Sequence, residues 1–376
     1  MRQHLYTICM LFITKGLGYF ILVLTNPLFA SHISLEAYGT LALLWSICNI
    51  MAVIIEFGYP IHAVSELATN RNKHTIACFV KLKIVLTLLG LIVYLIVALS
   101  LVDNIILVLI GAAIPISAGI SNLWIYNGLK QQLFLVKLSI VGRVASLPIL
   151  GIFLYSPNIY TAACFMSAFW IFPALLTLVF TKTVIGNMAD GDFSITYAKI
   201  FPVALQSIVM AVINFGTPFY LYVVADSHLT GLFLALERSV KPFNAVVYPI
   251  AQYLLPRVND RSIILTTRRI TKIGIIIGIV AVIASLLFYL ISGMHVIIPF
   301  NIFIQYLPIL VLSILNKLTF DLIVTVADKE NEYLLRYLLL YGCCLIFITF
   351  NFTLEILIYG LLITEFLLFL LTMRKV

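Results

Sequence analysis

Charged side chains are scarce in this chain of 376 residues: Asp, Glu, Lys and Arg together make up 10% of it, while 63% of its residues are hydrophobic. Soluble globular domains carry about 25% charged residues. A chain of this length cannot hide so much apolar surface in a water-soluble core. The composition therefore excludes a soluble protein and predicts an all-α polytopic membrane protein.

Several motifs with known chemistry are also missing. The chain has no GxxxxGK[ST] phosphate-binding loop, so it is not expected to bind ATP by that route. Its six Cys residues show no CxxC pattern and its six His residues show no paired ligand spacing, which predicts neither a metal nor a cofactor. The net charge of +8 is scattered between apolar runs rather than forming a solvated stripe, so no nucleic-acid partner is expected.

Apolar windows of about twenty residues predict about twelve membrane spans. The first is read as a retained helix rather than a signal peptide, because Lys15 interrupts its apolar run and apolar sequence continues to Ala30. The windows are 5–30, 38–58, 84–102, 104–126, 134–155, 161–181, 199–224, 230–255, 273–293, 300–326, 333–350 and 354–373. We expect two pseudo-symmetric six-helix lobes around a central cavity, one formed by residues 1–190 and the other by residues 191–376.

Basic residues gather in alternate connections between these windows. They are Arg2, Arg71, Lys73, Lys81, Lys83, Lys130, Lys137, Lys182, Lys199, Arg257, Arg261, Arg268, Arg269, Lys272, Lys329, Arg336, Arg374 and Lys375. The opposite connections carry only acids, namely Glu36, Asp103, Asp226 and Glu355. Because cytoplasmic loops are enriched in Lys and Arg, both termini are predicted to lie in the cytoplasm.

The stretch 230–257 combines a span-length apolar run with three charges, Glu237, Arg238 and Lys241. At roughly 1.5 Å rise per residue, Lys241 lies about 16 Å from Thr230, near the middle of a ~30 Å hydrocarbon core. Each charge costs about 2.5 to 3.5 kcal/mol in that position. The three side chains are therefore expected to face protein or a water-filled cavity.

Other charges also fall inside predicted spans. Lys15 and Arg143 lie deep in their windows, and we expect them to share a cationic cavity with Arg238 and Lys241. Lys317 and Asp321 are four residues apart and could neutralise each other. Glu56 could reach outward from its span end. Glu365 is either a protonated core carboxyl or a ligand of a coupling ion, and the sequence leaves both open.

A weak internal repeat relates the two halves, since Pro27 to Gly39 followed by Pro60 resembles Pro218 to Gly231 followed by Pro249. Spans one and two would then correspond to spans seven and eight. Repeats of this kind are typical of transporters that work by alternating access, with the substrate site between the lobes near the midplane.

The run GLFLALERSVKPFNAVVYPIAQYLLPRVN resembles a stretch of Wzx-type O-antigen and polysaccharide flippases, which belong to the multidrug/oligosaccharidyl-lipid/polysaccharide exporter superfamily. Three earlier motifs follow the order found in that family: NPLFASHISLEAYGTLALLWSI, IIEFG at 54–58 and NLWIYNGLKQQ at 122–132. The resemblance covers about the first 260 residues and fades after roughly residue 290.

This resemblance implies a flippase of the bacterial inner membrane that moves undecaprenyl-pyrophosphate-linked oligosaccharide to the periplasmic leaflet. Glu237 and Arg238 in the ERSV motif would line the lumen, with Lys15, Arg143 and Lys241 adding positive charge. Trp124 and Tyr126 match family positions of less certain role. Apart from the glycan carrier and membrane lipids, the resemblance allows a polysaccharide polymerase and a chain-length regulator as partners.

Two other functions are consistent with a polytopic chain. A cation-coupled drug antiporter would require a net acidic cavity, and the charges within the spans are net basic. A membrane-embedded polysaccharide polymerase or ligase would need a sizeable polar periplasmic loop for its catalytic groups, and none of the predicted periplasmic loops exceeds about ten residues. A transporter without enzymatic activity is therefore expected.

Overall fold

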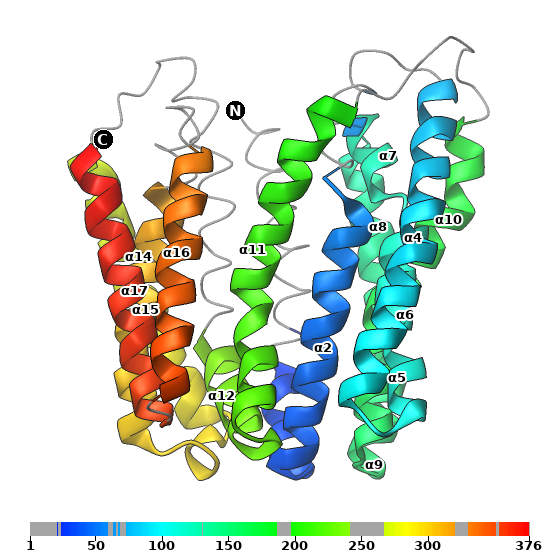
Figure 1. The fold of residues 1–376 in the computed structure, drawn as a ribbon. Coiled ribbons are helices and arrows are strands. Elements are labelled where there is room, and N and C mark those ends of the chain that lie inside the picture. The colour runs from blue at the N-terminus through cyan, green and yellow to red at the C-terminus, as the bar shows by residue number, and fades with distance from the viewer. Residues whose placement is uncertain are drawn as a thin grey trace. The chain divides into compact units, whose positions relative to one another are not determined.

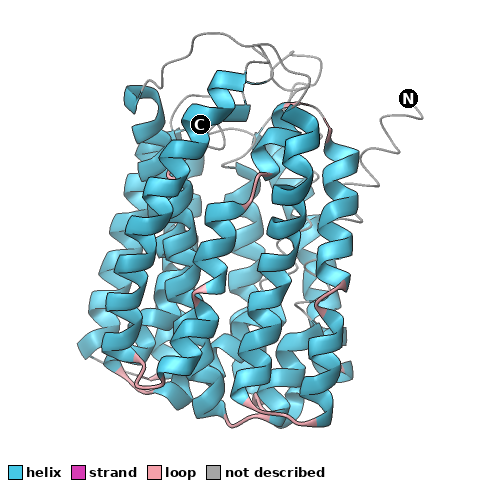
Figure 2. Cartoon of the chain, turned by 90° about the vertical axis from the view of Figure 1, so that its right-hand side faces the viewer, coloured by secondary structure: helices cyan, strands magenta, loops and turns pink. Residues whose placement is uncertain are grey.

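A computed structural model describes residues 21, 24–58, 63–64, 67, 73–129, 131–185, 197–240, 267–319, 330–350 and 353–375. All regular structure within these ranges is helical, and they contain no strand (Figure 2). The all-α fold predicted from composition is confirmed.

The helices, drawn in Figure 1, are α2 (Leu35–Glu56), α4 (Lys73–Leu101), α5 (Ile105–Gly111), α6 (Ala113–Ile120), α7 (Leu123–Gly128), α8 (Gln132–Val144), α9 (Leu147–Tyr155), α10 (Ile159–Ile185), α11 (Tyr197–Val224), α12 (Ser227–Val240), α14 (Thr267–Ile291), the 3-10 helix η2 (Met294–Val296), α15 (Phe300–Thr319), α16 (Glu330–Phe350) and α17 (Leu354–Lys375). Within the described ranges, eight helical stretches are long and apolar enough to cross a membrane. Each overlaps a predicted window, although His74–Leu101 begins well before its window at 84–102, and shorter apolar helices occupy two further windows, at Phe215–Val224 and Leu335–Ile346.

The chain divides by its internal contacts into two compact units. Unit 1 comprises Met1–Gly39 and Tyr220–Val376, and unit 2 comprises Thr40–Phe219. Helices α2 and α11 each contribute residues to both. The predicted boundary between lobes, at residues 190 and 191, lies outside the described residues and stays a prediction.

Helix α10 is the centre of unit 2 and packs against α5, α6, α8 and α9. Its closest neighbour is α8, where Gly142 lies directly against Pro173. A β-carbon at Gly142 would lie 2.5 Å from the backbone nitrogen of Pro173 and 2.7 Å from its Cα. Small residues at helix interfaces permit such close backbone packing inside a membrane.

This contact gives a stability prediction. Gly142→Ala is expected to destabilise the protein by about 1–3 kcal/mol, because the backbone of α10 must move to admit the methyl group. The matched control is Gly151→Ala on α9, where a β-carbon meets nothing within 4 Å. Thermal unfolding of the two purified variants in detergent compares them, and equal melting temperatures would show that the α8–α10 contact is not tight.

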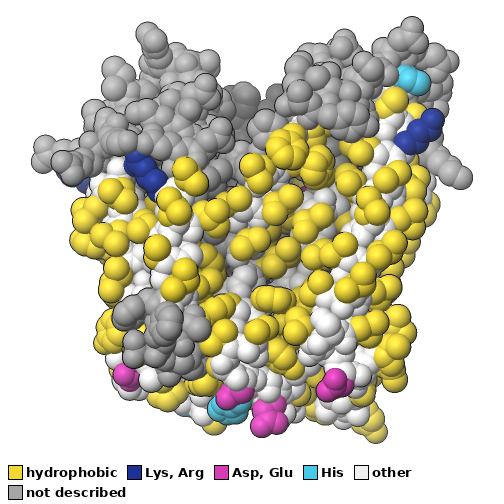
Figure 3. Space-filling view, viewed as in Figure 1, with side chains coloured by type: hydrophobic (Ala, Val, Ile, Leu, Met, Phe, Trp, Pro, Cys, Tyr) yellow, Lys and Arg dark blue, Asp and Glu magenta, His cyan; other side chains and the backbone are white. Residues whose placement is uncertain are grey.

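Helix α4 carries an apolar face that no part of unit 2 covers. Ile84, Leu88, Ile92 and Ile96 repeat every four residues and are 54–65% exposed. Residues at that spacing share one side of a helix. Hydrophobic side chains also cover the helices of unit 1 over the middle of the face shown in Figure 3. Exposed apolar stripes of this length are expected where helices meet lipid.

Helix α15 is the centre of unit 1 and packs against α12, α14 and α17, while α16 packs on α17. The turn between α14 and α15 is fixed by Tyr289, whose ring stacks on Phe303 with centroids 4.2 Å apart. The Tyr289 hydroxyl also donates to the carbonyl of Ile298 at 2.6 Å. These contacts hold α15 in the position from which its polar side chains reach α12, α16 and α17.

Charges separate to opposite ends of unit 1. Basic side chains stand near the starts of α14 and α16, at Lys272 and Arg336, whereas acidic ones stand at the starts of α2, α12 and α17. The acidic and basic side chains of this unit are accordingly seen at opposite ends of its helices in Figure 3. This is the separation that the alternation of basic and acidic connections predicted.

Candidate functional site

The first turn of α2 and the first turn of α12, which both belong to unit 1, touch through their backbones. A β-carbon at Gly39 would lie 1.7 Å from the carbonyl oxygen of Ser227, and one at Gly231 would lie 2.1 Å from that of Leu35. Each glycine thus meets the residue four positions before the other glycine. We call these four residues the glycine crossing. Gly39 and Gly231 occupy equivalent positions of the internal repeat, but the repeat did not predict that they meet.

Tyr38, next to the glycine crossing, links α2 to the charged end of α12. Its side chain is 2% exposed, and its hydroxyl donates to Oδ1 of Asn26 at 3.1 Å. It also lies within electrostatic range of Arg238 and Glu237. Glu237 and Arg238 therefore have a buried hydroxyl group within electrostatic range.

On α12, Phe233 and Glu237 are four residues apart and share a face. The ring of Phe233 packs edge-on against Tyr306 of α15, with centroids 6.3 Å apart. Glu237 is 3% exposed and acts electrostatically on Tyr306. The neighbouring Arg238 is only half-buried. The acid of the ERSV motif is thus enclosed, whereas its base is partly exposed with a buried Nε.

A second carboxyl, Glu365 of α17, also acts electrostatically on the Tyr306 hydroxyl. Asn316 of α15 donates to Oε2 of Glu365 at 2.5 Å, and the Tyr337 hydroxyl of α16 donates to Oε1 at 2.6 Å. Three helices therefore converge on this carboxyl. We refer to Asn26, Tyr38, Glu237, Arg238, Tyr306, Asn316, Tyr337 and Glu365 together as the polar network of unit 1.

The predicted site residues are distributed unevenly over the structure. Glu237 and Arg238 belong to the polar network, whereas Lys15 and Lys241 lie outside the described residues, as does Asp321. Arg143 lies in unit 2, where its guanidinium stands over the ring of Phe169 at 5.1 Å from the centroid. Such a cation–π contact contributes about 0.5–2 kcal/mol. The shared cationic cavity stays a prediction.

The sequence analysis missed most of the polar network. Tyr38, Tyr306 and Tyr337 look like ordinary aromatic residues of apolar runs, and only their hydroxyl contacts distinguish them. Asn316 carried a readable signal. An amide flanked by Leu315 and Lys317 in the middle of an apolar run must find partners inside the protein.

Lys83 corrects the predicted start of the third span, which the sequence placed at residue 84. It was expected in a basic connection, but α4 begins at Lys73, and Lys83 is 2% exposed inside it. Its Nζ donates to the carbonyl of Ser121, at the break between α6 and α7. It also lies within electrostatic range of Glu56, the last residue of α2. A helix break leaves carbonyls without intrahelical partners, and the ammonium satisfies one of them.

The same break explains the NLWIYNG motif. The backbone N–H of Asn122 donates to the hydroxyl of Thr177 at 3.1 Å. The Tyr126 hydroxyl donates to the backbone carbonyl of Thr177 at 3.2 Å. Trp124 is 4% exposed and packs edge-on against Phe79. Trp124 and Tyr126, whose role the resemblance left uncertain, are therefore core residues of unit 2.

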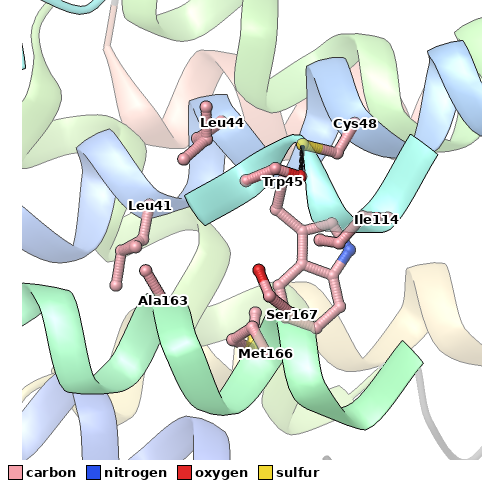
Figure 4. A pocket seen from close by; sticks show the side chains of 9 residues that line it. Leu41, Leu44, Trp45, Cys48, Ile114, Ala163, Met166 and Ser167 are labelled. Carbon is pink, nitrogen blue, oxygen red and sulfur yellow. Dashed lines mark hydrogen bonds between the residues drawn. The ribbon is translucent and has the colours of Figure 1, made fainter. Parts of the chain in front are cut away.

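A small cavity lies in unit 2 between α2, α6 and α10 (Figure 4). Trp45, Ile114 and Met166 line it with other apolar side chains, and the thiol of Cys48 donates to the carbonyl of Gly111 at 3.3 Å. About 20 Å³ of it is open to the centre of a water molecule. That is room for little more than one water, so the cavity is too small for a transported substrate.

Metal chemistry finds no support in the described part of the chain, where no group of three or more His, Cys, Asp or Glu residues could hold an ion. The expectation that the protein carries no metal stays a prediction, because Asp321 and two of the six His residues, His4 and His62, lie outside the described residues.

Comparison with known proteins places the fold. No family model matches the chain, and no curated protein matches it. A solved structure described as the inward-facing conformation of a multidrug resistance MATE family transporter of the MOP superfamily superimposes with a TM-score of 0.68. The match covers 95% of this chain and 94% of that chain at 14% identity. This chain is therefore a multi-pass membrane protein with the fold of a MATE family transporter.

Proposed function

We propose that this protein is a flippase for a lipid-linked anionic glycan, of the undecaprenyl-pyrophosphate-linked class. It moves this substrate from the cytoplasmic to the periplasmic leaflet of the inner membrane by alternating access. The observation that carries the proposal is the division of charge on α12, where Glu237 is 3% exposed and the adjacent Arg238 is half-buried.

This division of charge suits an anionic headgroup. A charged side chain inside a membrane protein faces the protein interior or water, and costs several kcal/mol otherwise. With Glu237 enclosed, the group that α12 presents is the guanidinium of Arg238. Its planar fork of donors matches a phosphate in a bidentate arrangement, which an ammonium cannot reproduce.

The second candidate is drug antiport, and the structural neighbour favours it because that protein is described as a multidrug resistance transporter. A cationic drug would need an accessible carboxylate. In the described part of unit 1, Glu36 and Glu355 are exposed in the first turns of their helices, whereas the two carboxyls deeper inside helices, Glu237 and Glu365, are 3% and 8% exposed. Neither is placed to meet a large cation in this conformation, so we favour the flippase.

Deletion of the gene in its native host separates the two candidates. The flippase predicts that surface glycan disappears, that lipid-linked repeat units accumulate at the cytoplasmic face, and that sensitivity to cationic drugs stays unchanged. Re-expression of the wild-type chain restores the glycan. Normal glycan display together with raised drug sensitivity would instead identify the protein as a drug exporter.

The proposed direction of transport depends on topology, with both termini in the cytoplasm. A single cysteine at His228, an exposed residue in the first turn of α12, is expected to react with a membrane-impermeant thiol reagent from the periplasmic side. The control is a single cysteine at Lys272, at the opposite end of unit 1, which should be protected in intact cells. Both variants are made in a chain whose six native cysteines are replaced. The reverse labelling pattern would invert the proposed direction.

A further inference from the structure

Glu365 is enclosed by polar groups from two other helices. It lies on α17, is 8% exposed, and accepts hydrogen bonds from Asn316 on α15 and Tyr337 on α16. Asn316 also donates to the backbone oxygen of Glu365 at 2.9 Å. An ionisable side chain inside a membrane span costs free energy, and such side chains mark functional sites by default.

Asn316 supplies a second observation. Its side chain is 3% exposed, and among the residues that the structure describes its Oδ1 has no hydrogen-bond partner. A buried amide oxygen without a donor is rare, since almost all buried polar atoms in proteins are paired. Asn316 Oδ1 can therefore accept a hydrogen bond from one further donor.

The Glu365 carboxyl lies where such a donor is needed. The side-chain amide of Asn316 is within hydrogen-bond distance of Oε2 of Glu365. Rotation of the amide by a half turn exchanges its nitrogen and oxygen, and brings Oδ1 to face the carboxyl.

We propose that Glu365 is a reversible proton-binding site of the transporter, with Asn316 as its two-way partner. In the ionised state the Asn316 amide nitrogen donates to the carboxylate. When a proton from water binds Oε2, the acid O–H donates to Asn316 Oδ1, and the nitrogen gives up its bond to the backbone oxygen. Tyr337 donates to Oε1 in both states.

The surroundings connect this site to α12. Glu365 accepts a hydrogen bond from Tyr337 of α16 and acts electrostatically on Tyr306 of α15. Tyr341 of α16 also acts electrostatically on Tyr306. Glu237 acts on the same Tyr306 hydroxyl from α12. Other charged residues with described side chains on α15, α16 and α17 are Lys317, Arg336 and Glu355, and Arg336 donates to the carbonyl of Leu371. Because a nearby like charge disfavours ionisation, a negative charge on Glu237 would favour the protonated form of Glu365.

Infrared difference spectroscopy tests the proposal without any substrate. In the full-length protein in lipid nanodiscs, the carboxylic-acid C=O absorption that appears as pH falls is expected to include a component from Glu365, which we call the band. Glu365→Gln should remove this component while the absorption of the other carboxyls remains, and Glu355→Gln, at an exposed position of the same helix, should leave it intact. Tyr337→Phe keeps the carboxyl and should move the band to higher frequency, because its carbonyl loses a hydrogen bond.

Three outcomes would overturn the proposal. The band could survive in Glu365→Gln, it could be absent at every pH in the wild type, or it could be displaced by sodium chloride at constant pH, which would make the site a sodium site. Should Glu365→Gln fail to reach the membrane, the frequency shift in Tyr337→Phe still decides the assignment. None of these results depends on which substrate is transported.

Discussion

Gly39→Ala is expected to destabilise the protein by about 1–3 kcal/mol, which is the usual cost of forcing an extra carbon into a close-packed interior. The added methyl group would stand 1.7 Å from the carbonyl oxygen of Ser227, and that oxygen belongs to a helix backbone and cannot rotate away. The first turns of α2 and α12 must therefore separate. Gly231→Ala should cost about as much, because its contact with Leu35 is the reciprocal one.

Thermal unfolding in detergent measures both effects, with Gly342→Ala on α16 as the control, since a β-carbon there meets nothing within 4 Å. The double variant provides the sharper test. Once one methyl group has separated the helices, the second costs little, so the double variant should lose less stability than the two single variants combined. Strict additivity, or single variants as stable as the control, would show that the two helices do not share one crossing.

Arg238→Lys is expected to abolish most of the transport of a lipid-linked glycan while leaving the protein at normal abundance in the membrane. Lysine keeps the charge but loses the two parallel donors of the guanidinium. Loss of a bidentate, charge-assisted interaction costs about 1.5–3 kcal/mol, which corresponds to at least a tenfold reduction in rate. Surface glycan per unit of membrane protein is the quantity to compare.

Glu237→Gln separates binding from structure in this motif. If Glu237 only neutralised Arg238 within the fold, the variant would accumulate to a lower level because a buried charge would lose its counter-charge. We expect normal abundance and reduced glycan display. Full display by Arg238→Ala at normal abundance would remove this arginine from the mechanism.

The membrane helices could be predicted from the sequence because span length and hydropathy are local properties. Every predicted window that the structure describes contains helix, including 104–126, which the structure breaks into α5, α6 and α7. The start of α4 was misplaced because Lys81 and Lys83 were assigned to a loop by charge alone. In the fold, Lys83 donates to the carbonyl of Ser121, which is 38 residues later in the chain. A local sequence pattern cannot predict a partner at that separation.

The candidate site could be predicted only in part for the same reason. Glu237 and Arg238 stood out because charges are rare in apolar runs, and Glu365 was singled out on that ground with its role left open. Tyr306 became meaningful only when α15 was seen to pack against both α12 and α17, and the same packing identified the partner of Asn316. The glycine crossing lies between these extremes, since the repeat identified both glycines and the structure showed that they meet.

Reconstitution tests the central claim most directly. The purified protein is placed in liposomes that contain a fluorescent undecaprenyl-pyrophosphate-linked oligosaccharide in the inner leaflet, and an impermeant quencher outside reports its appearance in the outer leaflet. The flippase account predicts quenching that develops with the wild type, and little above protein-free liposomes with Arg238→Ala. No quenching with the wild type, in liposomes where the same protein transports a fluorescent cationic drug, would contradict the account.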